Sequence, residues 1–165
     1  MDAARLFEEH HGALLRYLVR LTGDGDLAAD AAQEAFARLV AKPPRDERPR
    51  AWLFTVATNV VRAAANNGRR RRELLERSVT RVPVADAPPR PDEDLERREL
   101  RRTVRTALDS LSNKERTVLL MREEGFSHRE IAAAVGTTTG SVGTMIARAL
   151  DKLAERLPLD PEDNP

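Results

Sequence analysis

The chain has 165 residues, enough for one ordinary domain or two small ones. Its 28 Lys and Arg against 27 Asp and Glu leave a net charge of +1, so the overall charge identifies no partner. The absence of Cys excludes a disulfide framework, a zinc site of the Cys type and a cysteine nucleophile. We expect a cytoplasmic protein without membrane insertion, because no apolar run approaches the roughly 18 residues of a membrane span and the first residues do not resemble a signal peptide.

The composition favours helices throughout the chain. Aromatic residues make up only 4% of it and charged residues 33%, while Ala, Leu, Arg and Glu are abundant. These abundant residues lose little conformational freedom on entering a helix. The sequence therefore predicts an all-α protein.

A proline-rich segment divides the chain into two parts. Four prolines fall within residues 78–95, and proline fixes φ and interrupts helices. We therefore expect a semi-extended linker at 78–95 between two small helical domains, residues 1–77 and 96–157, with an acidic tail at 158–165. Just before the linker, residues 45–77 hold nine basic and four acidic side chains, a strongly basic stretch.

The first domain is expected to be a bundle of three or four helices. Gly23-Asp24-Gly25 ends the first helix, the second runs from about Asp26 to Val40, and Pro49 suits the first position of the third, which Asn66-Asn67-Gly68 would end. The residues expected to face the core are Leu6, Phe7, His10, Leu14, Leu18 and Leu21, then Leu27, Ala31, Ala32, Ala35, Phe36 and Leu39, then Trp52, Leu53, Val56, Ala57, Val60 and Ala64.

The second domain is expected to contain short helices in close succession. A charged helix from about Asp92 to Leu111 comes first. Ser112-Asn113-Lys114-Glu115 and Ser127-His128-Arg129-Glu130 then match the capping box that begins a helix. A last helix is expected from about Gly140 to Arg156.

The spacing after the second capping box is typical of a helix-turn-helix. Counted from His128, Ala132 is fifth, Gly136 ninth and Val142 fifteenth, with Ile131, Val135 and Met145 as apolar partners. Ala132 allows a close helix crossing, Gly136 can take the left-handed conformation of the turn, and Val142 fills the angle between the helices. The second helix would lie in the major groove. The candidate DNA contacts are Thr138, Thr139, Ser141, Thr144 and Met145 at base edges, and Arg129 and Arg148 at phosphates.

The same spacing would fit a packed helical hairpin that touches no DNA. In addition, Gly143 and Met145 stand where a more basic second helix would carry Lys or Arg. Hydroxyl groups can bond to bases or phosphates but add no charge. We therefore expect this domain to bind DNA weakly by itself, so that something else must hold it there.

Three motifs in a fixed order resemble the extracytoplasmic-function (ECF) sigma factors of bacterial RNA polymerase. They are Asp30-Ala-Ala-Gln33-Glu34-Ala-Phe36, Trp52-Leu-Phe-Thr-Val-Ala-Thr-Asn59, and Ala107-Leu-Asp-Ser-Leu111 with Glu130-Ile-Ala132, Gly136 and Ser141-Val142. The resemblance covers about residues 5–75 and 96–157. It implies sigma region two in residues 1–77 and region four in 96–157, and a factor that binds core polymerase and directs promoter recognition, melting and initiation.

The resemblance also implies roles for single residues. Docking on the clamp coiled coil of the polymerase β′ subunit would involve Asp30, Gln33, Glu34 and Arg38. The minus-ten element would be read and opened by Arg45, Arg48, Arg50, Trp52, Asn59, Arg62, Arg69, Arg70, Arg71 and Arg72, and the minus-thirty-five element by the helix-turn-helix residues named above. Without the resemblance, the docking residues would be a solvated face, Trp52 a core residue and the four consecutive arginines a solvated helix end.

The partners implied are core RNA polymerase, through its β′ clamp coiled coil and β flap, and promoter DNA. Most members of the family also have an anti-sigma factor, which no feature of this sequence identifies. Two other functions stay open: a helix-turn-helix regulator that needs no polymerase, and a sigma-like decoy that does not support initiation. An enzyme has little support, because His10, His11 and His128 form no metal motif and a glycine-rich phosphate loop is absent, so we expect no cofactor and no metal.

Overall fold

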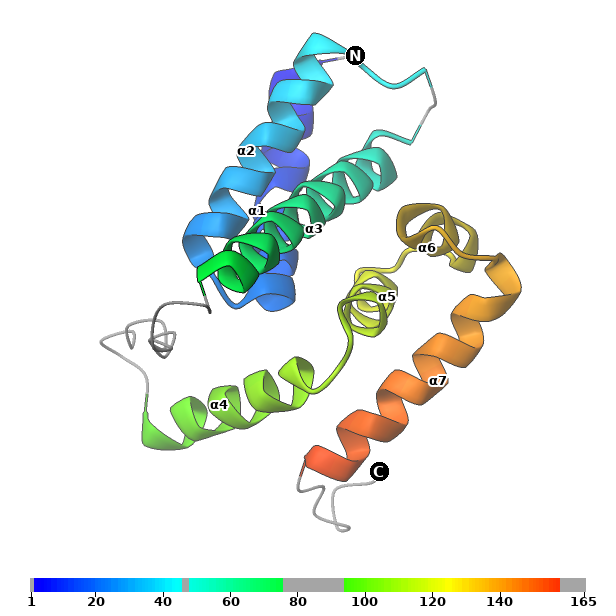
Figure 1. The fold of residues 1–165 in the computed structure, drawn as a ribbon. Helices are drawn as coiled ribbons and strands as arrows, with labels where there is room; N and C mark the ends of the chain where they lie inside the picture. Colours follow the sequence, from blue (N-terminus) through cyan, green and yellow to red (C-terminus); the bar gives the residue numbers. More distant parts are fainter. Residues whose placement is uncertain (1, 46–47, 76–93, 158–165) are drawn as a thin grey trace. The chain divides into compact units, whose positions relative to one another are not determined.

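The computed structural model describes residues 2–45, 48–75 and 94–157, and the side chains of these residues except 69–75. Every regular element in these ranges is a helix, which confirms the all-α prediction. The helices form two compact units, α1–α3 and α4–α7 (Figure 1). Most of the predicted linker and the predicted tail lie outside the described residues. No helix that the structure describes is both long and apolar enough to cross a membrane.

The first unit consists of α1 (Ala3–Thr22), α2 (Gly25–Ala41) and α3 (Pro49–Leu75), which pack against one another (Figure 1). Asp2 and Asp24 cap α1 and α2, each accepting two backbone N–H groups that a helix start leaves unpaired. Gly23 ends α1 in the left-handed conformation, with φ of 70°. The predicted stop at this glycine and the predicted start at Pro49 are confirmed.

The core of this unit differs from the prediction in the face that α3 buries. Leu53, Phe54, Ala57 and Thr58 are buried, whereas four of the residues predicted to face inward are half-buried, namely Trp52, Val56, Val60 and Ala64. The buried face is fixed by Tyr17 of α1, whose hydroxyl lies 2.8 Å from Thr58 Oγ1 and whose ring packs 5.0 Å from that of Phe54.

Three further residues predicted to face the core are not buried. Phe7 is 46% exposed, and His10 and Leu27 are half-buried. Phe7 lies on the rim of the α1–α2 contact, where its ring stacks on His11 at 4.4 Å and meets Phe36 at 4.9 Å. Aromatic stacking at the rim therefore replaces the expected burial.

Gly68 does not end α3, contrary to the prediction. The helix continues to Leu75, seven residues beyond it. A glycine inside a helix costs about 1 kcal/mol relative to alanine, and Asn66 and Asn67 are also poor helix formers, but the three alanines before them and the four arginines after Gly68 offset this cost. The consequence is that the backbone of the four consecutive arginines, residues 69–72, lies within α3.

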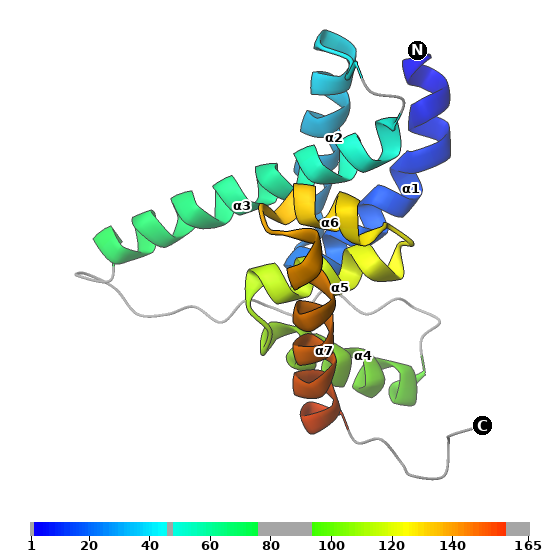
Figure 2. The ribbon, with the colours of Figure 1, turned by 90° about the vertical axis from the view of Figure 1, so that its right-hand side faces the viewer.

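The second unit consists of α4 (Leu95–Asp109), α5 (Asn113–Glu123), α6 (His128–Val135) and α7 (Thr139–Arg156). The helix α7 packs against α5, α6 and α4 (Figure 2). Both predicted capping boxes are confirmed, with Ser112 beginning α5 and Ser127 beginning α6. Each helix therefore begins where the sequence places its cap.

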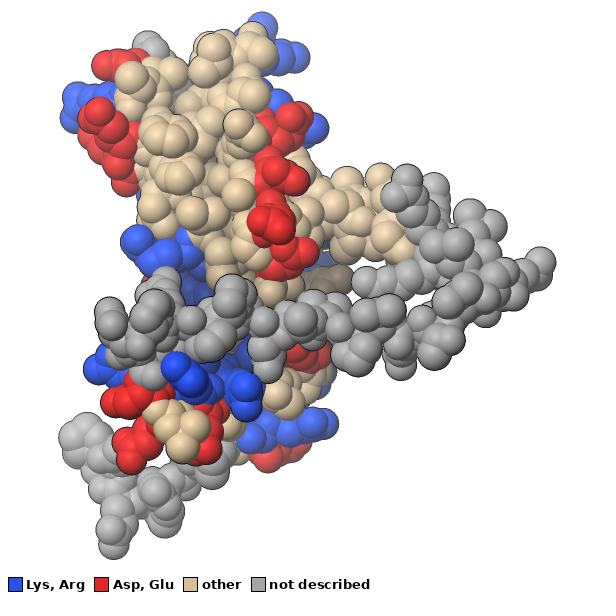
Figure 3. All heavy atoms as spheres, turned by 90° about the vertical axis from the view of Figure 1, so that its left-hand side faces the viewer, with Lys and Arg blue, Asp and Glu red and all other residues tan. Residues whose placement is uncertain are grey.

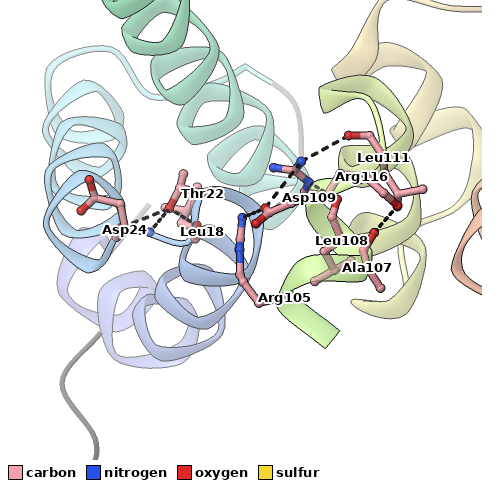
Figure 4. A network of polar contacts seen from close by, with 10 residues as sticks. Leu18, Thr22, Asp24, Arg105, Ala107, Leu108, Asp109, Leu111 and Arg116 are labelled. Carbon is pink, nitrogen blue, oxygen red and sulfur yellow. Dashed lines mark hydrogen bonds and ion pairs between the residues drawn. The ribbon is translucent and has the colours of Figure 1, made fainter. Parts of the chain in front are cut away.

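Arg116 joins α4 to α5. Its Nε donates to the carbonyl of Leu108 at 2.9 Å and its Nη2 to that of Leu111 at 3.2 Å, so it satisfies carbonyls at the end of α4 (Figure 4). Burial, and then the nearby Arg105, lower the pKa of Arg116, while Asp109 opposes this change. The contact therefore ties the end of α4 to the start of α5.

Candidate nucleic-acid and partner interfaces

The α6–α7 pair has the geometry of a helix-turn-helix. Ala132 and Val142 are buried between the helices, and Gly136 closes α6 in the left-handed conformation with φ of 68°. Its N–H bonds to the carbonyl of Ala132, and the N–H of Thr137 reaches the same carbonyl at 3.0 Å. Ile131 and Val135 are also buried. The turn and the packing therefore have the arrangement that the spacing indicates.

The second helix presents mostly small and hydroxyl-bearing residues at its N-terminal end. Among the candidate DNA contacts, Thr138, Thr139, Thr144 and Arg148 are exposed, while Ser141 and Met145 are half-buried. The hydroxyls of Thr138 and Ser141 lie 2.7 Å apart and hydrogen-bond to each other. Arg148 is the first cation along α7, and Arg129 of α6 is exposed. This surface can form hydrogen bonds but offers little charge.

An ion pair with α5 adds to the apolar packing that holds α7. Lys152 Nζ donates to Glu115 Oε1 at 2.7 Å and Oε2 at 2.9 Å. Glu115 Oε2 also accepts the Ser112 N–H at 2.9 Å, so one carboxylate serves both the capping box and the ion pair. The hydrogen bond from Lys152, followed by that from Ser112, lowers the pKa of Glu115. The charged carboxylate therefore stabilises the packing of α7.

The predicted docking residues share the outer side of α2. Asp30, Gln33, Glu34 and Arg38 are all exposed, and Arg38 Nε donates to Glu34 Oε1 at 2.7 Å. The opposite side of the helix is buried and consists mainly of alanines. Figure 3 shows mostly uncharged residues over the visible face of the first unit, with acidic side chains gathered along it. The structure thus brings these four residues together on one open surface.

The candidate minus-ten residues that the structure describes lie on α3 and the loop before it. Arg45, Arg48 and Asn59 are exposed, and Trp52 and Arg62 are half-buried. Trp52 and Asn59 are two helical turns apart and therefore lie on one side of α3. Trp52 is only half-buried, because the fully buried face of α3 is the neighbouring one.

The remaining minus-ten candidates are Arg50, which also packs within its own unit, and the four consecutive arginines near the end of α3. Arg50 is half-buried, with its guanidinium carbon 5.1 Å from the centre of the Phe54 ring, so it also supports the fold of its own unit. For Arg69, Arg70, Arg71 and Arg72 the backbone is helical, and their side chains lie outside the described residues. The basic end of α3 therefore continues the helix that carries Trp52.

Two family models match the chain, one in each unit. "Sigma-70 region 2" matches residues 6–71, and "Sigma-70, region 4" matches residues 101–153. The ECF RNA polymerase sigma factor EcfG of Rhodopseudomonas palustris is 31% identical over 153 residues, which cover 90% of this chain and 81% of that protein. The chain belongs to the ECF sigma factors.

Further similarities agree with this assignment. The ECF sigma factor SigE of Mycolicibacterium smegmatis is 31% identical over 92% of this chain, which spans 60% of the length of that protein. The sigma factor RpoE of Bartonella quintana, solved with the anti-sigma factor NepR, has a TM-score of 0.72 at 26% identity and covers 95% of this chain and 97% of its own. Sigma factors are transcription initiation factors without enzymatic activity, and their function is promoter recognition. The family predicted from the three motifs is therefore confirmed.

Asp26 is one exposed residue of this sigma factor that is not among the predicted docking residues. It lies one turn before Asp30 on α2, so Asp26, Asp30 and Glu34 form an acidic line along the helix. The spacing of four residues between the acids could have indicated it. Glu115 and Lys152 were also not predicted to interact, and because they are 37 residues apart no local pattern could have paired them.

Proposed function

We propose that this sigma factor binds core RNA polymerase and brings two weak DNA-binding units to two promoter elements. In this assignment residues 1–77 act as region two, 78–95 as the linker and 96–157 as region four. The observation that supports this proposal most strongly is the composition of α7, the recognition helix of the helix-turn-helix. Its exposed N-terminal side has hydroxyl and small residues and no cation before Arg148. Because cations supply most non-specific DNA affinity, this helix needs the polymerase to hold it at DNA.

The outer side of α2 is the proposed docking surface for the β′ clamp coiled coil. Asp30, Gln33, Glu34 and Arg38 lie there on a rigid helix whose other side is buried. Asp26 extends the same line by one turn. A partner helix with basic residues would complement this acidic line, and such charge matching sets orientation and encounter rate. The second unit would meet the β flap.

The outward side of α3 is the proposed minus-ten surface. Partial exposure leaves the Trp52 ring available for contact with a base, and Asn59 is exposed two turns further on. A melted strand binds to a basic groove with aromatic stacking surfaces. Arg45, Arg48 and Arg50 before this surface, with Arg62 and Arg69–Arg72 after it, would supply the phosphate contacts.

The linker would let both units reach their elements at once. A chain of about 18 residues extends to roughly 60 Å, comparable with two turns of B-DNA once the domain widths are added. Tethering raises the effective concentration of the second unit once the first is bound. Two weak contacts therefore become one specific complex.

An anti-sigma factor is the proposed regulator. The solved sigma factors RpoE and CnrH are similar to this chain over 95% and 93% of its length, and their structures contain the anti-sigma factor NepR and the cytosolic domain of CnrY, respectively. We expect a partner of this kind to compete with the polymerase. The protein would act in the cytoplasm, where polymerase and promoters are found.

Transcription in vitro with purified core polymerase and a pool of promoter fragments tests this function. Sequencing the transcript starts should reveal two shared elements upstream of a common start. A decoy would yield no transcript that depends on the chain, and a polymerase-independent regulator would select DNA with core polymerase omitted. Either result would contradict the proposal.

A further inference from the structure

The helix α4 has an apolar stripe that α7 covers only in part. Leu108 and Leu111, at the end of this stripe, are buried together with Ala149 of α7. One and two turns before Leu108, on the same side of α4, Val104 is 39% exposed and Leu100 is 63% exposed. An amphipathic helix normally buries its apolar stripe against another element. The first half of α4 therefore has an apolar face that the described part of the chain leaves partly uncovered.

Arginines line one edge of this exposed face. Arg97 and Arg101 are both exposed, lie one turn apart and flank Val104, and Arg105 follows after another turn. The acid Glu96 lies at the opposite edge of the stripe. Like charges four residues apart on a helix repel each other. An acidic segment along the arginine edge would reduce this repulsion, so the face suits an acidic partner that also carries an apolar side chain.

The chain that follows α7 starts close to this face. Leu157, the first residue after α7, has an extended conformation. From their contact at Leu108 and Ala149, α4 and α7 diverge so that the start of α4 and the end of α7 lie toward the same end of the unit, as Figure 1 and Figure 2 both show. Eight extended residues span about 26 Å, and a helix of the length of α4 spans about 22 Å. Residues 158–165 are therefore long enough to reach along α4.

The composition of residues 158–165 complements that face. The segment contains three acids and no cation, and its one large apolar residue is Leu159; the acids are Asp160, Glu162 and Asp163. Because the segment is covalently joined to its own α4, weak contacts are enough to hold it at the high effective concentration of a tethered group. A second copy of the chain or a segment of the polymerase lacks this advantage.

We propose that residues 158–165 bind α4 of the same chain, with Leu159 against Val104 and the three acids beside Arg97 and Arg101. The contact belongs to the second unit alone, so it does not depend on the proposed function. It covers the exposed part of the apolar stripe in the free protein. A partner that uses this face of α4 has to displace the segment first, and its apparent affinity is lowered by the fraction of chains in which the segment is bound.

Disulfide trapping in the isolated full chain tests the contact, because the protein has no Cys of its own. Val104→Cys with Leu159→Cys should form a disulfide within the chain under mild oxidation. Thr106→Cys with Leu159→Cys is the matched control, since Thr106 is exposed two residues further along and points to the other side of α4. The pair with Val104 should close about tenfold faster than the control pair at low salt, because docking raises the local concentration of the two thiols.

Charge variants separate docking from chance encounters of the two thiols. Arg97→Glu with Arg101→Glu should slow closure of the Val104 pair about fivefold, because repulsion replaces attraction. Adding Asp160→Arg and Glu162→Arg should restore the rate, since the exchange places opposite charges together again. Salt at about 1 M should also slow closure when the original charges are present.

Three results would overturn the proposal. The first is equal closure of the two cysteine pairs, or a rate that neither salt nor the charge variants change. The second is disulfides formed mainly between chains, which would place a second copy on this face. The third is protection of a single Val104→Cys from a maleimide only after core polymerase is added, which would place a polymerase segment there.

Discussion

The ion pair between Glu115 and Lys152 is expected to stabilise the recognition helix α7 against local opening. The side chain of Glu115 is only 15% exposed and that of Lys152 is 50% exposed. Lys152→Met removes the charge and keeps the methylene stem, and Glu115→Gln removes the opposite charge at nearly constant size. Glu115→Ala also removes the acceptor for the Ser112 N–H. The three changes therefore separate the ion pair from the capping box.

The loss of stability expected for Glu115→Ala exceeds that expected for Lys152→Met or Glu115→Gln by the contribution of the Ser112 hydrogen bond to the capping box. An ion pair with one half-exposed partner contributes about 0.5 kcal/mol, so Lys152→Met and Glu115→Gln should each lower the opening free energy of α5 and α7 by about that amount. Their double variant should cost about as much as either alone. Glu115→Ala should cost about 1.5 kcal/mol in total, because loss of the hydrogen bond from the Ser112 N–H adds about 1 kcal/mol.

The effect of Lys152→Met should depend on pH. Since Lys152 lowers the pKa of Glu115 in the folded protein, its contribution is fully present above the unfolded-state pKa of about 4.3 and is lost as pH falls through the lowered value. The difference between wild type and Lys152→Met should therefore close in acid.

Amide hydrogen exchange resolved to single helices is the suitable assay, because Trp52 and Tyr17 lie in the other unit and cannot report on α7. Lys114→Met, which removes an exposed cation from α5, is the control and should leave exchange unchanged. An unchanged opening free energy in Lys152→Met at pH 7, or a difference that does not shrink as the pH falls further and further below about 4.3, would refute the reasoning.

Three other predictions test the turn and the two interfaces of the first unit. Gly136→Ala should lower the free energy of unfolding in urea by about 1–2 kcal/mol because φ is +68°, whereas Gly140→Ala, which meets open space, should not lower it. Asp30→Ala with Gln33→Ala should weaken capture of core polymerase at unchanged helicity, and equal co-purification would remove the docking assignment. Replacing Arg69–Arg72 with alanine should reduce promoter opening more than polymerase binding, and an unaltered permanganate footprint would show that these arginines are not needed.

Local signals in the sequence predicted where most helices begin and turn. Ser112 and Ser127 cap their helices through bonds to residues three positions ahead, and Gly23 and Gly136 take the left-handed conformation at helix ends. Pro49 begins α3 as expected. Such contacts span only a few residues, so spacing alone reveals them.

Contacts between distant residues could not be predicted in this way. The face that α3 buries depends on Tyr17 and Thr58, which are 41 residues apart, and periodicity placed the buried stripe too close to Trp52. The end of α3 was misplaced because Asn66-Asn67-Gly68 was given more weight than the alanines before it and the arginines after it. The candidate interface residues on α2 and α7 mostly lie on open faces, as the sequence indicated, but their partners remain predictions.

The most direct test of the account is promoter binding by the chain alone and by the chain with core polymerase, measured on the same selected duplex. Because the recognition helix has so few cations, the account predicts that sequence-specific binding appears only when core polymerase is present. Tight and specific binding of that duplex by the isolated chain, unaffected by core polymerase, would contradict it.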